Sequence, residues 1–160
     1  IQALDADGKI LVRGARATWM PDEPSTRADI LRALRTATSS GSSPLPGIKK
    51  AIETFYNPDF KISIYYLGDD YKAEAGPGFL SSTPSAAINR ALKVIDKLNV
   101  ADEQGNRKVA IHAVGLPVLW QTDFAKYSEH VKSRQRFATL MRLITARNGG
   151  TFVGIDAIEQ

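Results

Sequence analysis

The chain has 160 residues, of which 43% are hydrophobic and 24% are charged. That length suffices for one substantial hydrophobic core, so we expect a single domain over residues 1–160. No run of apolar residues is long enough to cross a bilayer, so membrane insertion is not expected. Cys is absent, which excludes disulfides, thiolate nucleophiles and Cys-based zinc sites.

Positive charge is in modest excess and is dispersed. The 21 Lys and Arg residues outnumber the 17 Asp and Glu residues, and the formal net charge is +4. Nucleic-acid-binding domains usually concentrate basic residues in a stripe with interleaved aromatic side chains, or carry a reader motif, and neither pattern occurs here. Nucleic acid is therefore not an expected partner.

Strand-like and helix-like segments alternate along the chain. Residues 1–19 are strand-like with a turn at residues 5–8, and a short helix follows Pro24, with Thr26 and Asp29 spaced like a capping box. Runs of β-branched and aromatic residues predict strands at 61–67, 108–114 and 151–155. Apolar residues at helical spacing predict helices through 48–55, 88–98 and 137–144.

This alternation predicts an α/β fold. Crossovers of this length join parallel strands, so we expect a doubly wound, mostly parallel sheet with helices on both faces. The nearly continuous apolar character of the strands at 61–67 and 108–114 is typical of strands that are buried on both sides. The last helix is expected to end at Asn148-Gly149-Gly150, a left-handed C-terminal signal.

Polar side chains gather where two of these elements meet a loop. Asp69 and Asp70 follow the strand at 61–67, and a serine-rich loop that ends at Ser43 precedes a helix. Ligands of open parallel sheets bind where the strands end, and carboxylate and hydroxyl oxygens suit a hard cation such as Mg²⁺. Spacing alone leaves the alternative that both aspartates begin a turn and that Ser43 caps a helix.

Four segments, in this order and spacing, resemble the von Willebrand factor type A domain. They are Gly-Ser-Ser-Pro-Leu at 41–45, Leu-Gly-Asp-Asp at 67–70, Ile-His-Ala-Val-Gly at 111–115 and Asn-Gly-Gly-Thr-Phe at 148–152. The resemblance covers residues 30–155. It implies a Rossmann-like fold and a metal-ion-dependent adhesion site, which is the site of a protein-binding module for adhesion or assembly and not of an enzyme.

The resemblance also implies roles for particular residues. Ser43 stands where the family has a metal-binding Thr, and Asp69 where it has its third-loop Asp, while Ser42, Asp70 and Tyr71 lie where the partner binds. In the family, a carboxylate of a protein partner completes the shell of Mg²⁺ or Mn²⁺. If the site is functional, Ser43 Oγ and the Asp69 carboxylate should lie about 3 to 6 Å apart.

One part of the family pattern has no counterpart. The Asp-x-Ser-x-Ser loop and the strand before it are absent, so we expect a domain that is N-terminally incomplete and that binds metal weakly on its own. If another copy supplies the missing strand, the protein is a homo-oligomer. The residues do not determine the compartment, although many bacterial members of the family face the periplasm or the cell surface.

Two other functions remain open. One is a Mg²⁺-dependent hydrolase or phosphotransferase with Asp69 or Asp70 as base or metal ligand, but no phosphate-loop Lys, nucleophile motif or second acidic cluster occurs. The other is a structural domain with a degenerate metal site. His112 and His130 lack the sequence context of a catalytic triad and are expected to be structural.

Overall fold

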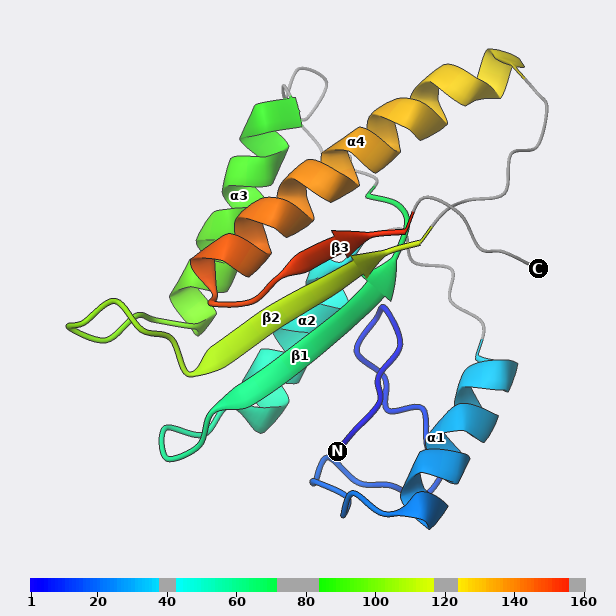
Figure 1. The fold of residues 1–160 in the computed structure, drawn as a ribbon, viewed down its shortest axis with the longest axis vertical. Helices are drawn as coiled ribbons and strands as arrows, with labels where there is room; N and C mark the ends of the chain where they lie inside the picture. The colour runs from blue at the N-terminus through cyan, green and yellow to red at the C-terminus, as the bar shows by residue number, and fades with distance from the viewer. Residues whose placement is uncertain (38–42, 72–83, 117–123, 156–160) are drawn as a thin grey trace.

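The structure, a computed structural model, describes residues 1–37, 43–71, 84–116 and 124–155. Its fold is mixed α/β, as the alternation of predicted elements indicates (Figure 1). In chain order the elements are α1 (Pro24–Thr36), α2 (Leu45–Phe55), β1 (Ile62–Gly68), α3 (Pro84–Leu98), β2 (Val109–Gly115), α4 (Phe124–Arg147) and β3 (Phe152–Gly154).

The described strands form one parallel sheet in the order β1-β2-β3. Ile62 lies opposite Val109, and Ala113 lies opposite Phe152. The parallel pairing expected of the segments at 61–67 and 108–114 is therefore confirmed. Because both crossovers step in the same direction, right-handed connections place α3 and α4 on the same face of the sheet.

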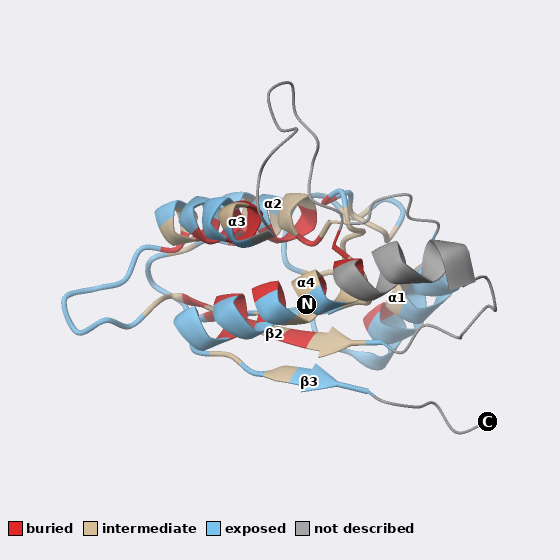
Figure 2. Cartoon of the chain, turned by 90° about the horizontal axis from the view of Figure 1, so that it is seen from above, coloured by how far each residue is buried: buried red, intermediate tan, exposed pale blue. Residues whose placement is uncertain are grey.

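That face carries the hydrophobic core. Side chains that alternate along β1 and β2 point into it, and helices α2, α3 and α4 each add one apolar stripe. Figure 2 shows α2 and α3 as one layer and β3 at the opposite border of the molecule. The most deeply buried large side chains of the core are Ile48, Ile52, Ile95, Val109, Ile111, Leu140, Met141 and Ile144.

The other face of the sheet is open. Tyr65 is 68% exposed, Leu67 62% and Val153 54%. Within the described ranges, α2, α3 and α4 share one core on a single face, so the expected helices on both faces are not found there. Burial along β1 alternates residue by residue, as in a sheet that is packed on one side. The run at 61–67 suggested burial on both sides because its exposed positions, Tyr65 and Leu67, are also apolar.

The N-terminal segment differs from its prediction. Residues 1–19 form no strand but only an isolated antiparallel bridge between Leu4 and Ile10. The expected turn is present, and the Asp5 carboxylate accepts hydrogen bonds from the backbone N–H groups of Asp7 and Lys9 at 3.0 and 2.8 Å. This Asx turn uses the acidic side chain locally and so accounts for the aspartate at this position.

Helix α1 begins earlier than its sequence signal suggests. Its N-cap is Glu23, which makes no side-chain cap hydrogen bond, and Thr26 lies inside the helix and is buried. The predicted capping box of Thr26 and Asp29 is therefore wrong. Pro24 occupies the first turn, where its missing N–H has no cost, and this proline explains the helix start better.

The turn between α4 and β3 follows its prediction. Gly149 has a φ of 65°, the left-handed conformation expected at a helix end, and the Gly150 N–H donates to the carbonyl of Thr145 at 2.9 Å. Gly150 then passes so close to β2 that an ideal Cβ at this position would lie 1.9 Å from the carbonyl oxygen of Ile111. Only glycine allows the chain to turn into β3 at this point.

Candidate functional site

The candidate site lies at the carboxyl edge of the sheet, where β1 ends at Gly68. Because the strands are parallel, the ends of β1 and β2 share this edge, and the Leu116 N–H extends their pairing by donating to the Gly68 carbonyl at 2.8 Å. Asp69 and Asp70 follow immediately and are half-buried. The sheet thus places both carboxylates where α/β folds usually bind ligands.

The side chain of Tyr66 lies beside these carboxylates. Its ring folds over Gly68, where an ideal Cβ would lie 2.9 Å from the Tyr66 hydroxyl. Burial, followed by the negative charges of Asp69 and Asp70, raises the pKa of Tyr66 to about 12. The phenol therefore stays neutral over the physiological range and keeps its proton as a hydrogen-bond donor at this edge.

Alkaline titration tests this arrangement. A group whose folded-state pKa is raised contributes stability that is present below its ordinary pKa of 10.0 and is lost as the pH rises through about 12. The variant Tyr66→Phe has no phenol to ionise. Between these pH values we therefore expect its free energy of unfolding, measured by urea denaturation, to fall less than that of the wild type. Parallel losses in both proteins would contradict the assignment. The double variant Asp69→Asn/Asp70→Asn should lower the pKa of Tyr66, measured by phenolate absorbance.

Two polar atoms near this edge lack partners. Asp70 Oδ1 and Arg136 Nε are buried, and neither has a hydrogen-bond partner among the described residues. Leaving a buried acceptor or donor unpaired costs roughly 1 to 3 kcal/mol, and more for a charged group. An ordered water or an ion can satisfy such an atom, so the Asp70 oxygen favours a cation or a donor and the Arg136 nitrogen favours an acceptor.

The two segments that carry these atoms are packed together. The ring of Tyr66 in β1 lies 6.0 Å from that of Phe137 in α4, and Ser133 Oγ donates to the Tyr71 carbonyl at 3.2 Å. Arg136 precedes Phe137 on α4, at a position with no sequence signal for a site. Sequence reasoning therefore missed it, because its proximity to β1 depends on the packing of α4.

The remaining predicted site residues differ in their environments. Tyr71 is only 4% exposed and belongs to the core, so its interpretation as a partner-contacting side chain does not fit its position. Ser43 is half-buried, and its Oγ accepts a hydrogen bond from the Leu45 N–H at 3.4 Å, as a residue at a helix start does. Ser42 lies outside the described residues. The expected approach of Ser43 to Asp69 stays a prediction.

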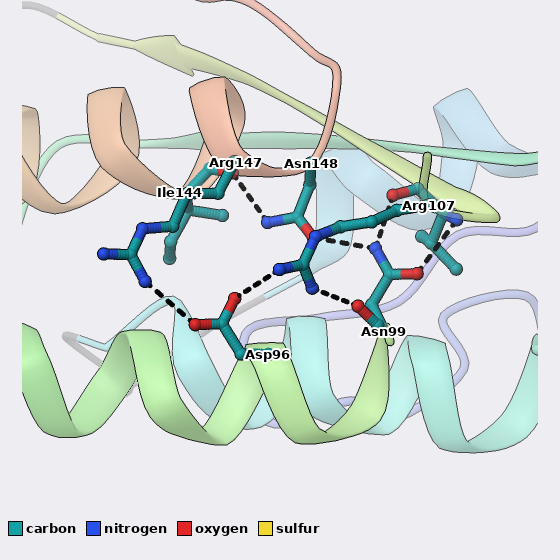
Figure 3. Close-up of polar contacts among 7 residues, drawn as sticks. Asp96, Asn99, Arg107, Ile144, Arg147 and Asn148 are labelled. Atoms are coloured by element: carbon teal, nitrogen blue, oxygen red, sulfur yellow. Dashed lines mark hydrogen bonds and ion pairs between the residues drawn. The ribbon is translucent and has the colours of Figure 1, made fainter. Parts of the chain in front are cut away.

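A second polar cluster lies at the opposite, amino edge of the sheet (Figure 3). Asn99 is fully buried, and its side-chain amide donates to the Val109 carbonyl and to the Asn148 side chain, each at 2.7 Å. Its oxygen accepts from the Val109 N–H at 3.2 Å, and Asn148 in turn donates to the Ile144 carbonyl at 2.7 Å. These bonds join the ends of α3 and α4 to the first residue of β2.

Charged residues flank this pair of asparagines. Asp96 on α3 binds Arg107 with one carboxylate oxygen and Arg147 with the other, each at 2.9 Å, and Arg107 also donates to the Asn99 carbonyl. Because every member of the cluster has a partner within it, the cluster stabilises the domain. A sequence signal existed, since Asn99 follows the buried Ile95 by four residues and so falls on the apolar face of its helix.

The other candidates have structural roles. The His112 ring stacks on Tyr65 with a centroid distance of 4.8 Å, and its Nδ1 lies 3.1 Å from Thr151 Oγ1. These contacts account for His112 without a catalytic partner. The side chain of His130 lies outside the described residues. In the described ranges, no three His, Asp or Glu side chains gather into a metal-binding group.

Comparisons with known proteins add no relatives. No family model, no curated protein and no solved structure matches the chain. The likeness to the von Willebrand factor type A domain therefore rests on the sequence segments alone. Among the helices of the described ranges, none combines the length and the hydropathy that a membrane span needs.

Proposed function

We propose that this domain is a protein-binding module whose carboxyl edge engages an acidic group of its partner through a divalent cation. The observation that carries this proposal is the buried Asp70 Oδ1, which has no partner among the described residues. A cation beside Asp69 and Asp70 would satisfy this oxygen and neutralise two neighbouring carboxylates. Mg²⁺ and Mn²⁺ fit best, since hard cations prefer carboxylate ligands.

The partner is proposed to bind through the cation. Once a cation occupies the aspartates, a carboxylate of the partner can complete the cation's shell. Ser43 is proposed to contribute its hydroxyl group to the cation and Ser42 to lie where the partner binds, as the resemblance implies. With few protein ligands the bare site binds Mg²⁺ weakly, because this ion gives up its water reluctantly. Partner and cation therefore bind together.

We also propose that the sheet is doubly wound. A doubly wound sheet has helices on both faces, and the exposed apolar side chains of Tyr65, Leu67 and Val153 support a cover for the open face. The resemblance also supports a bacterial periplasmic or cell-surface setting, where such modules meet their partners. Catalysis is not part of the proposal, and Mg²⁺-stimulated hydrolysis of phosphoesters would favour an enzyme instead.

Terbium luminescence tests the cation site. Tb³⁺ binds oxygen sites and is excited by energy transfer from nearby tyrosines, and Tyr66 lies beside the proposed ligands. We expect the wild type to sensitise Tb³⁺ and an excess of Mg²⁺ to compete. The variant Asp70→Asn should weaken Tb³⁺ binding by roughly tenfold or more, as loss of a ligating or supporting group does.

The variant Asp59→Asn is the matched control. Asp59 is an exposed carboxylate in the loop before β1, away from the carboxyl edge, and its loss should leave Tb³⁺ binding unchanged. Equal affinities in Asp70→Asn and the wild type would refute the proposed cation site. Binding of a carboxylate-rich peptide that persists in EDTA would refute the cation dependence while leaving a binding module in place.

A further inference from the structure

The open face of the sheet carries exposed apolar side chains around the half-buried Val114. Strand register aligns Leu67 with Val114 and Val114 with Val153, so these three side chains form one row across β1, β2 and β3. In the next row Tyr65 stacks on His112. Side chains this large and this exposed on one flat face are typical of a surface that another element covers. We call Tyr65, Leu67, Val114 and Val153 the open-face patch.

Helix α1 carries an exposed apolar edge of its own. Leu31 is 58% exposed and Leu34 is 51% exposed, and their spacing of three residues puts them on the same side of the helix. Thr26, at the start of the helix, is buried, so α1 already packs on its own chain through another side. Figure 1 shows α1 apart from the three helices that cover the sheet. Among the described residues, the Leu31–Leu34 edge is therefore largely uncovered.

We propose that the protein forms a two-fold symmetric dimer in which α1 of each copy packs its Leu31–Leu34 edge on the open-face patch of the other copy. The dimensions agree. Helix α1 has 13 residues and is about 20 Å long, while β1 has 7 residues and is about 23 Å long. Leu31 and Leu34 are about 4.5 Å apart along the helix axis, and Tyr65 and Leu67 are about 6.6 Å apart along the strand.

Charge complementarity orients the helix parallel to β1. Asp22 and Glu23 precede α1, and Arg27 pairs with Asp22 at 2.7 Å, so the net charge of this end is that of Glu23, while Arg35 lies in the last turn. Lys61 lies at the amino end of β1, and Asp69 lies at the carboxyl end. In the parallel orientation, the acidic start of the helix lies near Lys61 and Arg35 lies near Asp69, whereas the antiparallel orientation would bring like charges together.

A second copy is a better source of the helix that covers the open-face patch than the chain's own α1. The Trp19 ring packs on Phe55 at the end of α2, with a centroid distance of 4.8 Å, five residues before α1 begins. This contact holds the segment before α1 against the end of α2, and Thr26 at the start of α1 is buried. A move of α1 onto its own open face would disturb both. A two-fold arrangement breaks neither and makes the helix–sheet contact twice.

Sedimentation velocity in EDTA tests the dimer without interference from a bound cation. We expect the wild type to change from monomer to dimer as its concentration rises through the micromolar range, with a weaker dimer at high salt. The helix variant Leu31→Glu/Leu34→Glu and the sheet variant Tyr65→Glu/Leu67→Glu should each weaken the dimer by more than about tenfold, since each buries charge in an apolar contact. Val100→Glu, which is the same kind of change at a 65% exposed loop position, should have no effect.

Mixing the two variants distinguishes a contact of α1 with the sheet of another copy from a contact of α1 with its own sheet. In a mixed dimer, α1 of the sheet variant meets the unaltered sheet of the helix variant, so one of the two contacts is restored and heterodimers should form. Far-UV circular dichroism and thermal unfolding verify that both variants fold. A wild type that stays monomeric, variants that dimerise like the wild type, or a mixture without heterodimers would each overturn the proposal.

Discussion

Replacing Gly150 with alanine is expected to lower the free energy of unfolding by at least about 3 kcal/mol. The added Cβ would lie 1.9 Å from the Ile111 carbonyl oxygen and 2.5 Å from its carbonyl carbon, so the clash is with the backbone of the central strand. Neither group can turn aside as a flexible side chain would. The chain must instead shift β3 away from β2 or distort the end of α4. Urea denaturation, followed by circular dichroism, measures the loss.

Gly149→Ala is the matched control. Gly149 is the neighbouring glycine and has a φ of 65°, but an ideal Cβ there meets nothing within 4 Å. Its replacement should therefore cost only the strain of the left-handed conformation, about 1 to 2 kcal/mol. If Gly149→Ala proved as damaging as Gly150→Ala, backbone conformation and not the close approach to β2 would explain the requirement for glycine in this turn.

Replacing Asn99 with leucine should destabilise the domain by about 3 to 5 kcal/mol. Leucine has a similar volume, but it would remove three hydrogen bonds and leave the backbone N–H and carbonyl of Val109 and the side chain of Asn148 unpaired in a buried site. Each such orphaned group costs roughly 1 to 3 kcal/mol, although Asn148 would keep its bond to Ile144. The shift of the urea midpoint at constant m-value reports this loss.

Two further variants separate hydrogen bonding from helix propensity. Asn89→Ala changes an exposed asparagine inside α3, the helix that Asn99 directly follows, and should alter stability by no more than about 0.5 kcal/mol. The variant Asn99→Asp keeps the shape but brings a charged oxygen to two buried acceptors, so it should be at least as damaging as leucine at neutral pH. A small effect of Asn99→Leu would mean that water replaces the lost partners.

Local patterns predicted the elements well. The strands were expected at 61–67 and 108–114 and lie at 62–68 and 109–115, and the three amphipathic helices lie where their apolar stripes placed them. Such patterns succeed because one buried face repeats along a helix or strand with the period of that element. The strand prediction at 1–19 was wrong. The residues have strand-like character, but a strand forms only where tertiary structure supplies a pairing partner, and here only an isolated bridge forms.

The candidate site was predicted only in part. Asp69 and Asp70 were recognisable because they directly follow a strand, which is a local property. Arg136 was not, because its neighbour Phe137 meets Tyr66, about 70 positions earlier in the chain, only through tertiary packing. Tyr71 shows the converse error, since its position beside two aspartates suggested exposure whereas packing places it in the core.

The sequence by itself thus determined the parallel α/β character, the strands at 61–67 and 108–114, and the glycine turn after α4, because each depends on neighbours within a few residues. Only the tertiary structure decided that the helices described here share one face of the sheet, that Asn99 bonds to Asn148 across 49 positions, and that the Asp70 carboxylate keeps an oxygen without a described partner. The physical reason is that burial and hydrogen-bond satisfaction depend on what packs against a side chain. Periodicity specifies which side of an element is apolar, but not what covers it.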